Sequence, residues 1–111
     1  MEREPAVYML ASAFHGTLYT GVTSTLLTRL HQHRSATTGF TARYLVHRLV
    51  WFEGHDRMET AIAREKSIKR WLRAWKYALI AESNPTWRDL AEDFGFAPLV
   101  RRQGGPGSSP G

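Results

Sequence analysis

Residues 6–23, AVYMLASAFHGTLYTGVT, decide the fold of this chain. Two short runs rich in apolar and β-forming residues, Ala6–Ala11 and residues 17–22, flank the segment 12–16, which contains a serine and a glycine. Short runs of this kind on either side of a glycine-containing loop are typical of a β-hairpin. We therefore expect the chain to open with two paired strands.

After the hairpin the apolar spacing changes from strand-like to helical. Thr23 and Ser24 are candidate N-caps for a helix whose leucines recur at helical spacing until about Ser35. Residues 46–53, VHRLVWFE, predict a third strand, which Gly54 ends.

The second half of the chain is predicted to be helical. Asp56 and Glu59 have the spacing of a capping box at the start of the clearest helix. Its apolar residues lie on one stripe: Met58, Ala61, Ile62, Ile68 and Leu72. A further helix over residues 74–82 ends before Pro85, and residues 86–94 add a short final helix.

The predicted order of elements is β-β-α-β-α-α, an α/β fold of the α+β type. It corresponds to a small three-stranded sheet, antiparallel or mixed, flanked by helices. With 111 residues the chain has room for one small domain, which we place at residues 6–95. Residues 1–5 are expected to be a flexible end, and residues 96–111 a disordered tail dominated by glycine, proline and serine.

Composition restricts the function. The chain has 15 basic and 10 acidic residues, a net charge of +5, which favours an anionic partner, nucleic acid before membrane. It has no cysteine, which excludes disulfides, thiolate metal sites and cysteine nucleophiles. No signal peptide or membrane span is indicated, so we expect a cytoplasmic protein.

Glu65 interrupts the apolar stripe of the clearest helix. A carboxylate buried without a partner costs several kcal/mol, roughly, so Glu65 needs a cation, a cluster of donors or a metal ion. Its pattern alone leaves two interpretations open: an ion pair with a neighbouring basic side chain, or a metal ligand.

Two tyrosines and a glycine lie on alternating positions of the predicted hairpin. Tyr19 shares a strand face with Gly21, and a suitable register would bring Tyr8 to the same face. Paired tyrosines in a hairpin are usually packing, but the bare glycine leaves room for close approach of a backbone or ligand. On the first helix, Arg29 and His33 are four residues apart and share a face.

The segment 64–76, REKSIKRWLRAWK, is the densest basic and aromatic cluster of the chain. It is either a solvated helix face with tryptophans in the core or a surface for phosphate contacts with some base stacking.

Taken together, these motifs resemble the GIY-YIG nuclease superfamily, and more closely its small standalone members. The resemblance is carried by Tyr8 on the first strand, Tyr19-Thr20-Gly21 on the second, Arg29 and His33 on the first helix, and Glu65 four residues after Ala61. Residues 40–44 (FTARY), 73–76 and 84–87 are also similar to the small subgroup.

The resemblance implies a metal-dependent endonuclease that hydrolyses DNA phosphodiester bonds, in repair or recombination. In this family pattern Glu65 binds the metal, Mg²⁺ or Mn²⁺. Tyr8 takes the proton of the attacking water, Tyr19 orients the water or phosphate, Arg29 neutralises charge, and His33 hydrogen-bonds Tyr8 or the phosphate. Expected nucleic-acid contacts are Gly21, Tyr44, Lys66, Lys69, Arg70, Arg73 and Lys76.

Two other classes remain open. The same fold without catalysis would be a nucleic-acid-binding module, and a protein-interaction domain is disfavoured because the basic residues cluster. DNA is expected as the partner before RNA.

Overall fold

The computed structural model describes residues 4–35, 39 and 45–99. Its elements are β1 (Ala6–Ala11), β2 (Leu18–Thr23), α1 (Leu26–Ser35), β3 (Arg48–Gly54), α3 (Met58–Lys69), α4 (Arg73–Ser83) and the 3-10 helix η1 (Leu90–Phe94). This order confirms the prediction from sequence. The FTARY segment, with its predicted contact residue Tyr44, lies outside the described residues.

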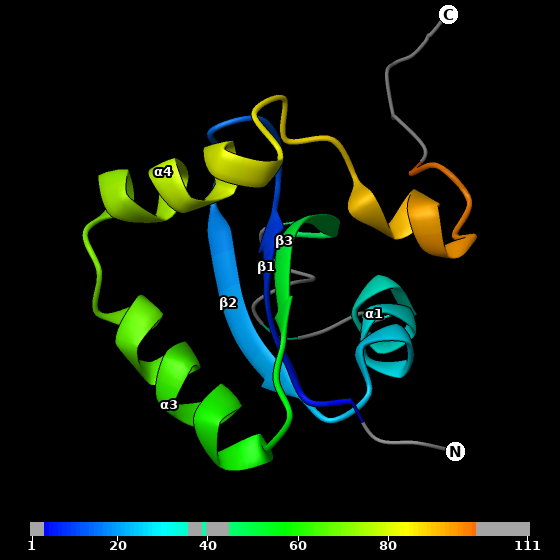
Figure 1. Ribbon diagram of the computed structural model, residues 1–111. Coiled ribbons are helices and arrows are strands. Elements are labelled where there is room, and N and C mark those ends of the chain that lie inside the picture. Colours follow the sequence, from blue (N-terminus) through cyan, green and yellow to red (C-terminus); the bar gives the residue numbers. More distant parts are fainter. Residues whose placement is uncertain (1–3, 36–38, 40–44, 100–111) are drawn as a thin grey trace, which may run out of the picture.

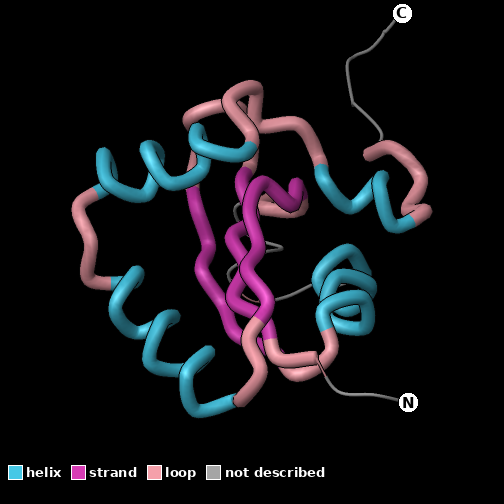
Figure 2. Tube along the Cα trace, viewed as in Figure 1, coloured by secondary structure: helices cyan, strands magenta, loops and turns pink. Residues whose placement is uncertain are grey.

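The three strands form one antiparallel sheet in the order β2-β1-β3. Helices α3 and α4 cover one face, and α1 and η1 cover the other, so the molecule has three layers (Figure 1). Figure 2 shows the strands between the two groups of helices. Because β1 is central and covered on both faces, all six of its residues are buried, which explains its nearly continuous apolar sequence.

Each face of the sheet has its own apolar core. The core beneath α3 and α4 is built from Val7, Met9, Ala11, Val50, Trp51, Ala61, Ile68, Ile80 and Trp87. The core beneath α1 and η1 is built from Tyr8, Leu10, Leu30, Val46, Leu49 and Ala91. Alternate residues of β1 therefore serve opposite cores, and this alternation sends Tyr8 toward α1.

Helix α3 begins differently from the prediction. Its N-cap residue is Arg57, which makes no side-chain cap, so the proposed Asp56–Glu59 capping box is wrong. Glu59 instead pairs with Arg57, Nε to Oε1 at 3.1 Å. The predicted stripe is also too long, because α3 ends at Lys69 and Leu72 is exposed at the start of α4.

The last helix is shorter than predicted because the backbone turns sharply before it. Trp87 is buried with φ of 59°, a left-handed conformation in which a helix cannot continue. Asp89 then caps η1, since its Oδ1 accepts from the Ala91 amide at 3.1 Å. The same oxygen accepts from the Leu49 amide at 3.0 Å, which ties η1 to β3.

Hydrogen bonds extend the domain slightly beyond the boundary placed at residue 6. The Glu4 amide donates to the Ser24 carbonyl at 2.9 Å, and the Pro5 carbonyl accepts from the His55 amide at 2.8 Å. At the other end Phe96 packs against the core beneath α1. Among the described residues, no helix has the length and apolar character needed to cross a bilayer.

Asp89 also anchors α1, and its loss should destabilise the fold. Its Oδ2 lies 2.6 Å from Arg34 Nη2, and both side chains are largely buried. We expect Asp89→Ala to lower the free energy of unfolding by about 3 kcal/mol, because it leaves a buried guanidinium unpaired. The control is Asp93→Ala, whose pair with Arg88 is exposed and should matter little. Urea denaturation of both variants tests this, and equal stabilities would contradict it.

Candidate active site

The hairpin register places the two tyrosines on one face. Tyr8 pairs with Gly21 and Leu10 pairs with Tyr19, so Tyr8 and Tyr19 are diagonal neighbours on the α1 side of the sheet. Their ring centroids are 6.2 Å apart. The condition set from sequence, a register that brings both tyrosines together, is met.

Gly21 is bare because Tyr8 occupies the space beside it. A Cβ built on Gly21 would lie 2.6 Å from Tyr8 Oη and 2.7 Å from Cζ, far inside van der Waals contact. From sequence we expected a ligand or a backbone to approach Gly21 closely. In the structure the phenol ring of Tyr8 makes that approach. Gly21 is buried, so its contribution to the site is to admit this ring rather than to offer contact surface.

Helix α1 completes an aromatic cluster. His33 Nε2 lies 2.8 Å from Tyr8 Oη, and the His33 ring packs against Tyr8 at 5.7 Å and edge-on against Tyr19 at 5.3 Å. Arg29, one helical turn earlier, is half-buried, and its charge acts on both Tyr8 and His33. Within the described part of the chain, no carboxylate forms an ion pair with Arg29.

The environment sets the protonation of this cluster. Burial raises the pKa of Tyr8, and the neighbouring Tyr19 raises it further, whereas the Arg29 charge lowers it. Burial outweighs the effect of Arg29. Burial also lowers the pKa of His33, helped by the charges of Arg29 and His47. In the neutral tautomer that carries its proton on Nδ1, His33 accepts at Nε2 the hydrogen bond that the Tyr8 hydroxyl donates.

Glu65 is buried at 8% exposure and is paired with Lys69, Oε2 to Nζ at 2.7 Å. The interpretation of Glu65 as a member of an ion pair is therefore confirmed. The Glu65 charge also raises the pKa of Tyr8, so the carboxylate lies within electrostatic reach of the tyrosine hydroxyl.

Helix geometry explains which side of α3 Glu65 occupies. Glu65 lies about 100° around the helix from Arg64, and Arg64 Nε bonds Glu53 Oε1 of β3 at 3.1 Å. The buried stripe of Ala61 and Ile68 runs between these two flanks. The flank of Glu65 therefore faces away from β3, toward the β2 side, where α3 packs on the strand that carries Tyr19.

The donor set around Glu65 suits one kind of metal. The described residues contain no cluster of three or more histidine, cysteine, aspartate or glutamate side chains, which disfavours a zinc-type cage. A single carboxylate with water and phosphate oxygens is a common way to hold Mg²⁺. Lys69, half exposed at 52% of its side chain, can leave Glu65 for solvent. The residues present thus fit the predicted ion.

The predicted phosphate-contact residues lie at the corner between α3 and α4. Lys66, Lys69, Arg70 and Arg73 are exposed, and Lys76 is half-buried.

One contributor to the site had no clear sequence pattern: His47, just before β3, whose charge lowers the pKa of His33. It lay inside an apparent strand and carried no motif spacing.

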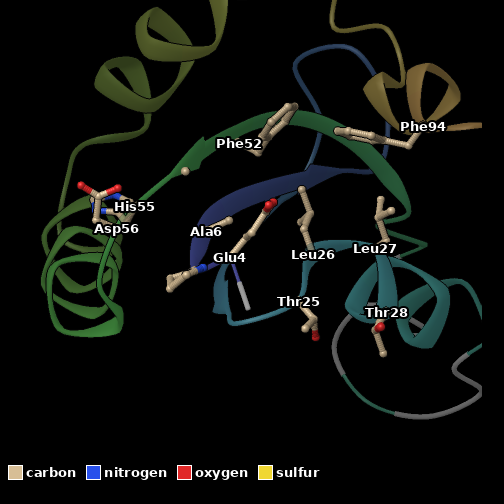
Figure 3. A pocket seen from close by; sticks show the side chains of 12 residues that line it. Glu4, Ala6, Thr25, Leu26, Leu27, Thr28, Phe52, His55, Asp56 and Phe94 are labelled. Atoms are coloured by element: carbon tan, nitrogen blue, oxygen red, sulfur yellow. The ribbon is translucent and has the colours of Figure 1, made fainter. Parts of the chain in front are cut away.

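A separate pocket of about 580 Å³ is lined by residues of α1, η1 and the sheet (Figure 3). Leu26 and Leu27 of α1, Phe52 of β3 and Phe94 of η1 line it, with Glu4 among them. None of the five predicted catalytic residues lines this pocket. The candidate site is instead the cluster of Tyr8, Tyr19 and His33 on the α1 side of the sheet.

Comparison with known proteins identifies the family of this chain. A family model described as the GIY-YIG catalytic domain matches residues 4–78 of the 111-residue chain. The chain therefore belongs to the GIY-YIG family, whose catalytic domains are typically nucleases that act on nucleic acid. Searches of curated proteins and of solved structures gave no significant match.

Adding one methyl group at Gly21 should disturb the cluster. Gly21→Ala forces Tyr8 to move, because the new Cβ would overlap its phenol, and we expect a loss of about 1–3 kcal/mol of stability from overpacking. Gly54→Ala is the matched strand control, since a Cβ there meets nothing within 4 Å. Thermal unfolding of the two variants measures the difference; a Gly21→Ala protein as stable as Gly54→Ala would contradict the packing.

The lowered pKa of His33 makes stability depend on pH. Below about pH 6.5 the unfolded chain binds a proton at this histidine while the native protein resists it, so stability falls as the pH decreases. We expect His33→Gln, which keeps an acceptor for Tyr8, to weaken this decline. Urea titrations between pH 5 and 8 are the measurement, about the range in which histidine titrates.

His47 has its pKa shifted in the same direction by burial, so the comparison is made in a His47→Gln background. The control is His31→Gln, on the exposed part of α1. An unchanged pH profile in the His33 variant would show that His33 is not held neutral by the fold.

Proposed function

We propose that this protein is a metal-dependent endonuclease that hydrolyses phosphodiester bonds of DNA. The observation that carries the proposal is the 2.8 Å contact between Tyr8 Oη and His33 Nε2, in a cluster that also receives the charges of Arg29 and Glu65. A hydroxyl bonded to a neutral imidazole, beside one cation and one carboxylate, suits proton removal next to an anionic substrate.

The proton of the attacking water is taken by the Tyr8–His33 pair. Because burial raises the pKa of Tyr8, Tyr8 is protonated at neutral pH and does not act alone as a base. Tyr8 passes its own proton to His33 Nε2 as its oxygen takes the proton of the water. Each transfer follows an existing hydrogen bond or one the water makes on arrival, so no charged phenolate accumulates.

The phosphate is held by the two remaining cluster residues. Arg29 stabilises the negative charge that develops on the non-bridging oxygens, because it has a guanidinium beside the cluster and no carboxylate partner among the described residues. Tyr19, packed edge-on against His33, orients the water or the phosphate.

Glu65 is the residue that would hold Mg²⁺ or Mn²⁺. When bound, such an ion polarises the phosphoryl oxygen and stabilises the leaving oxygen. Glu65 contributes a buried carboxylate whose Oε2 lies 2.7 Å from Lys69 Nζ. The basic residues that follow Glu65, from Lys66 to Lys76, are proposed to bind the DNA backbone.

Cleavage assays test this proposal. The purified protein is incubated with supercoiled, branched and single-stranded DNA and with RNA, in Mg²⁺ or in EDTA. We expect cleavage only with the metal, and a loss of at least about 100-fold in Tyr8→Phe and in Glu65→Gln. Glu82→Gln, an exposed change on α4, is the control.

Cleavage that persists in both variants would overturn the site assignment. Binding of DNA without cleavage by any form of the protein would instead favour the second class named from sequence, a nucleic-acid-binding module. Preferential cleavage of RNA would correct the assignment of DNA as substrate.

A further inference from the structure

Two large apolar side chains at the start of α4 are exposed. Leu72 is 63% exposed and Trp75 is 56% exposed. Their spacing of three residues places them on the same side of the helix end. Leu72 occupies the N-cap position but provides no side-chain cap, where a polar residue is normally found. Trp51 and Trp87, in contrast, are buried in the core, so packing does not explain Trp75.

Trp75 is the outermost of three side chains that pack in a row. The ring of Trp71 meets it edge-on at 6.3 Å, and the guanidinium of Arg64 lies over Trp71 at 5.4 Å. Arg64 is itself fixed by Glu53 through bonds of 3.1 and 3.4 Å. The exposed indole is therefore the outer end of an ordered stack, and it loses little conformational freedom when a partner binds.

The charged residues in the segment that contains this pair are all basic. Residues 66–81 include no acidic residue. Their basic residues are Lys66, Lys69, Arg70, Arg73 and Lys76. Lys69 reaches back to Glu65, with its Nζ 2.7 Å from the carboxylate, so this basic segment runs from the candidate metal ligand to the exposed pair.

We propose that Leu72 and Trp75 form a stacking surface for an unpaired nucleobase of the substrate strand. This inference rests on the proposed function and names the substrate class: nucleic acid with single-stranded or locally unpaired nucleotides. In a continuous duplex both faces of each base are covered by neighbouring base pairs, whereas an unpaired base has a π-face free to stack on an indole. The basic neighbours hold the phosphates on either side.

Charge complementarity favours this occupant over an apolar protein surface. An exposed aromatic side chain in a segment that has five basic and no acidic residues matches a ligand that is flat and anionic, and a nucleotide supplies both properties. A protein partner is a competing outcome in the experiment below.

The test measures DNA binding in the Glu65→Gln background with EDTA, so that cleavage does not interfere. The probes are a short single strand, its duplex, and the same duplex with one unpaired 2-aminopurine. We expect Trp75→Ala to weaken binding of the single strand and of the bulged duplex by about tenfold, and binding of the duplex by less than about twofold. Trp75→Phe should restore most of the affinity, because a phenyl ring also stacks.

Phe14→Ala is the matched control, since Phe14 is 55% exposed on the hairpin loop; it should leave all three affinities unchanged. Quenching of 2-aminopurine fluorescence on binding should disappear in Trp75→Ala and persist in the control. An equal loss of affinity for all three probes would overturn the inference. Unchanged affinity for all three would also overturn it and would favour a protein partner for this surface.

The outcomes separate this inference from the proposed function. If the wild-type protein fails to cleave but Trp75→Ala selectively loses unpaired DNA, the stacking surface stands and the nuclease proposal fails. If cleavage depends on Glu65 while Trp75→Ala binds all probes normally, the stacking surface fails alone. Thermal unfolding of each variant confirms that the change did not disrupt α4.

Discussion

The site depends on the fit of the Tyr8 ring over Gly21. Tyr8 belongs to the central strand, which is buried on both faces, so its hydroxyl can reach other groups only across the neighbouring strand β2. A side chain at position 21 would occupy that path. With glycine there, the phenol extends to His33 of α1 and lies within reach of the charges of Arg29 and Glu65. Groups from the sheet and from the helices on both of its faces therefore act on the Tyr8 hydroxyl.

Much of this arrangement was predictable from sequence, because alternation along strands and spacing along helices are local. The order of elements, the shared face of Tyr19 and Gly21, and the shared face of Arg29 and His33 follow from periods of two and 3.6 residues. The shared face of Tyr8 and Tyr19 also required the hairpin register, which the structure supplies. The contact that fills Gly21 was not predictable, since an empty position and one filled by a distant ring have the same sequence pattern.

The predictions failed where another contact or a turn of the chain replaced the expected local pattern. The capping box at Asp56 failed because Glu59 pairs with Arg57 instead. The final helix was shortened by the left-handed backbone of Trp87 and by Asp89, which bonds β3 as well as η1. Leu72 does not continue the apolar stripe of α3, because the helix ends at Lys69 and the chain turns there. Periodicity does not reveal where a helix ends when no proline or glycine marks the end.

The contact between Glu65 and Lys69 gives the molecule a built-in counterion. The Lys69 ammonium lies 2.7 Å from the buried carboxylate, so Glu65 has a cationic partner within its own helix. On the proposal that Glu65 holds a divalent ion, that ion would compete with a cation attached to the same helix. Occupancy of the carboxylate would then be an exchange between two cations, set by the ion concentration and by any anionic substrate that attracts the lysine.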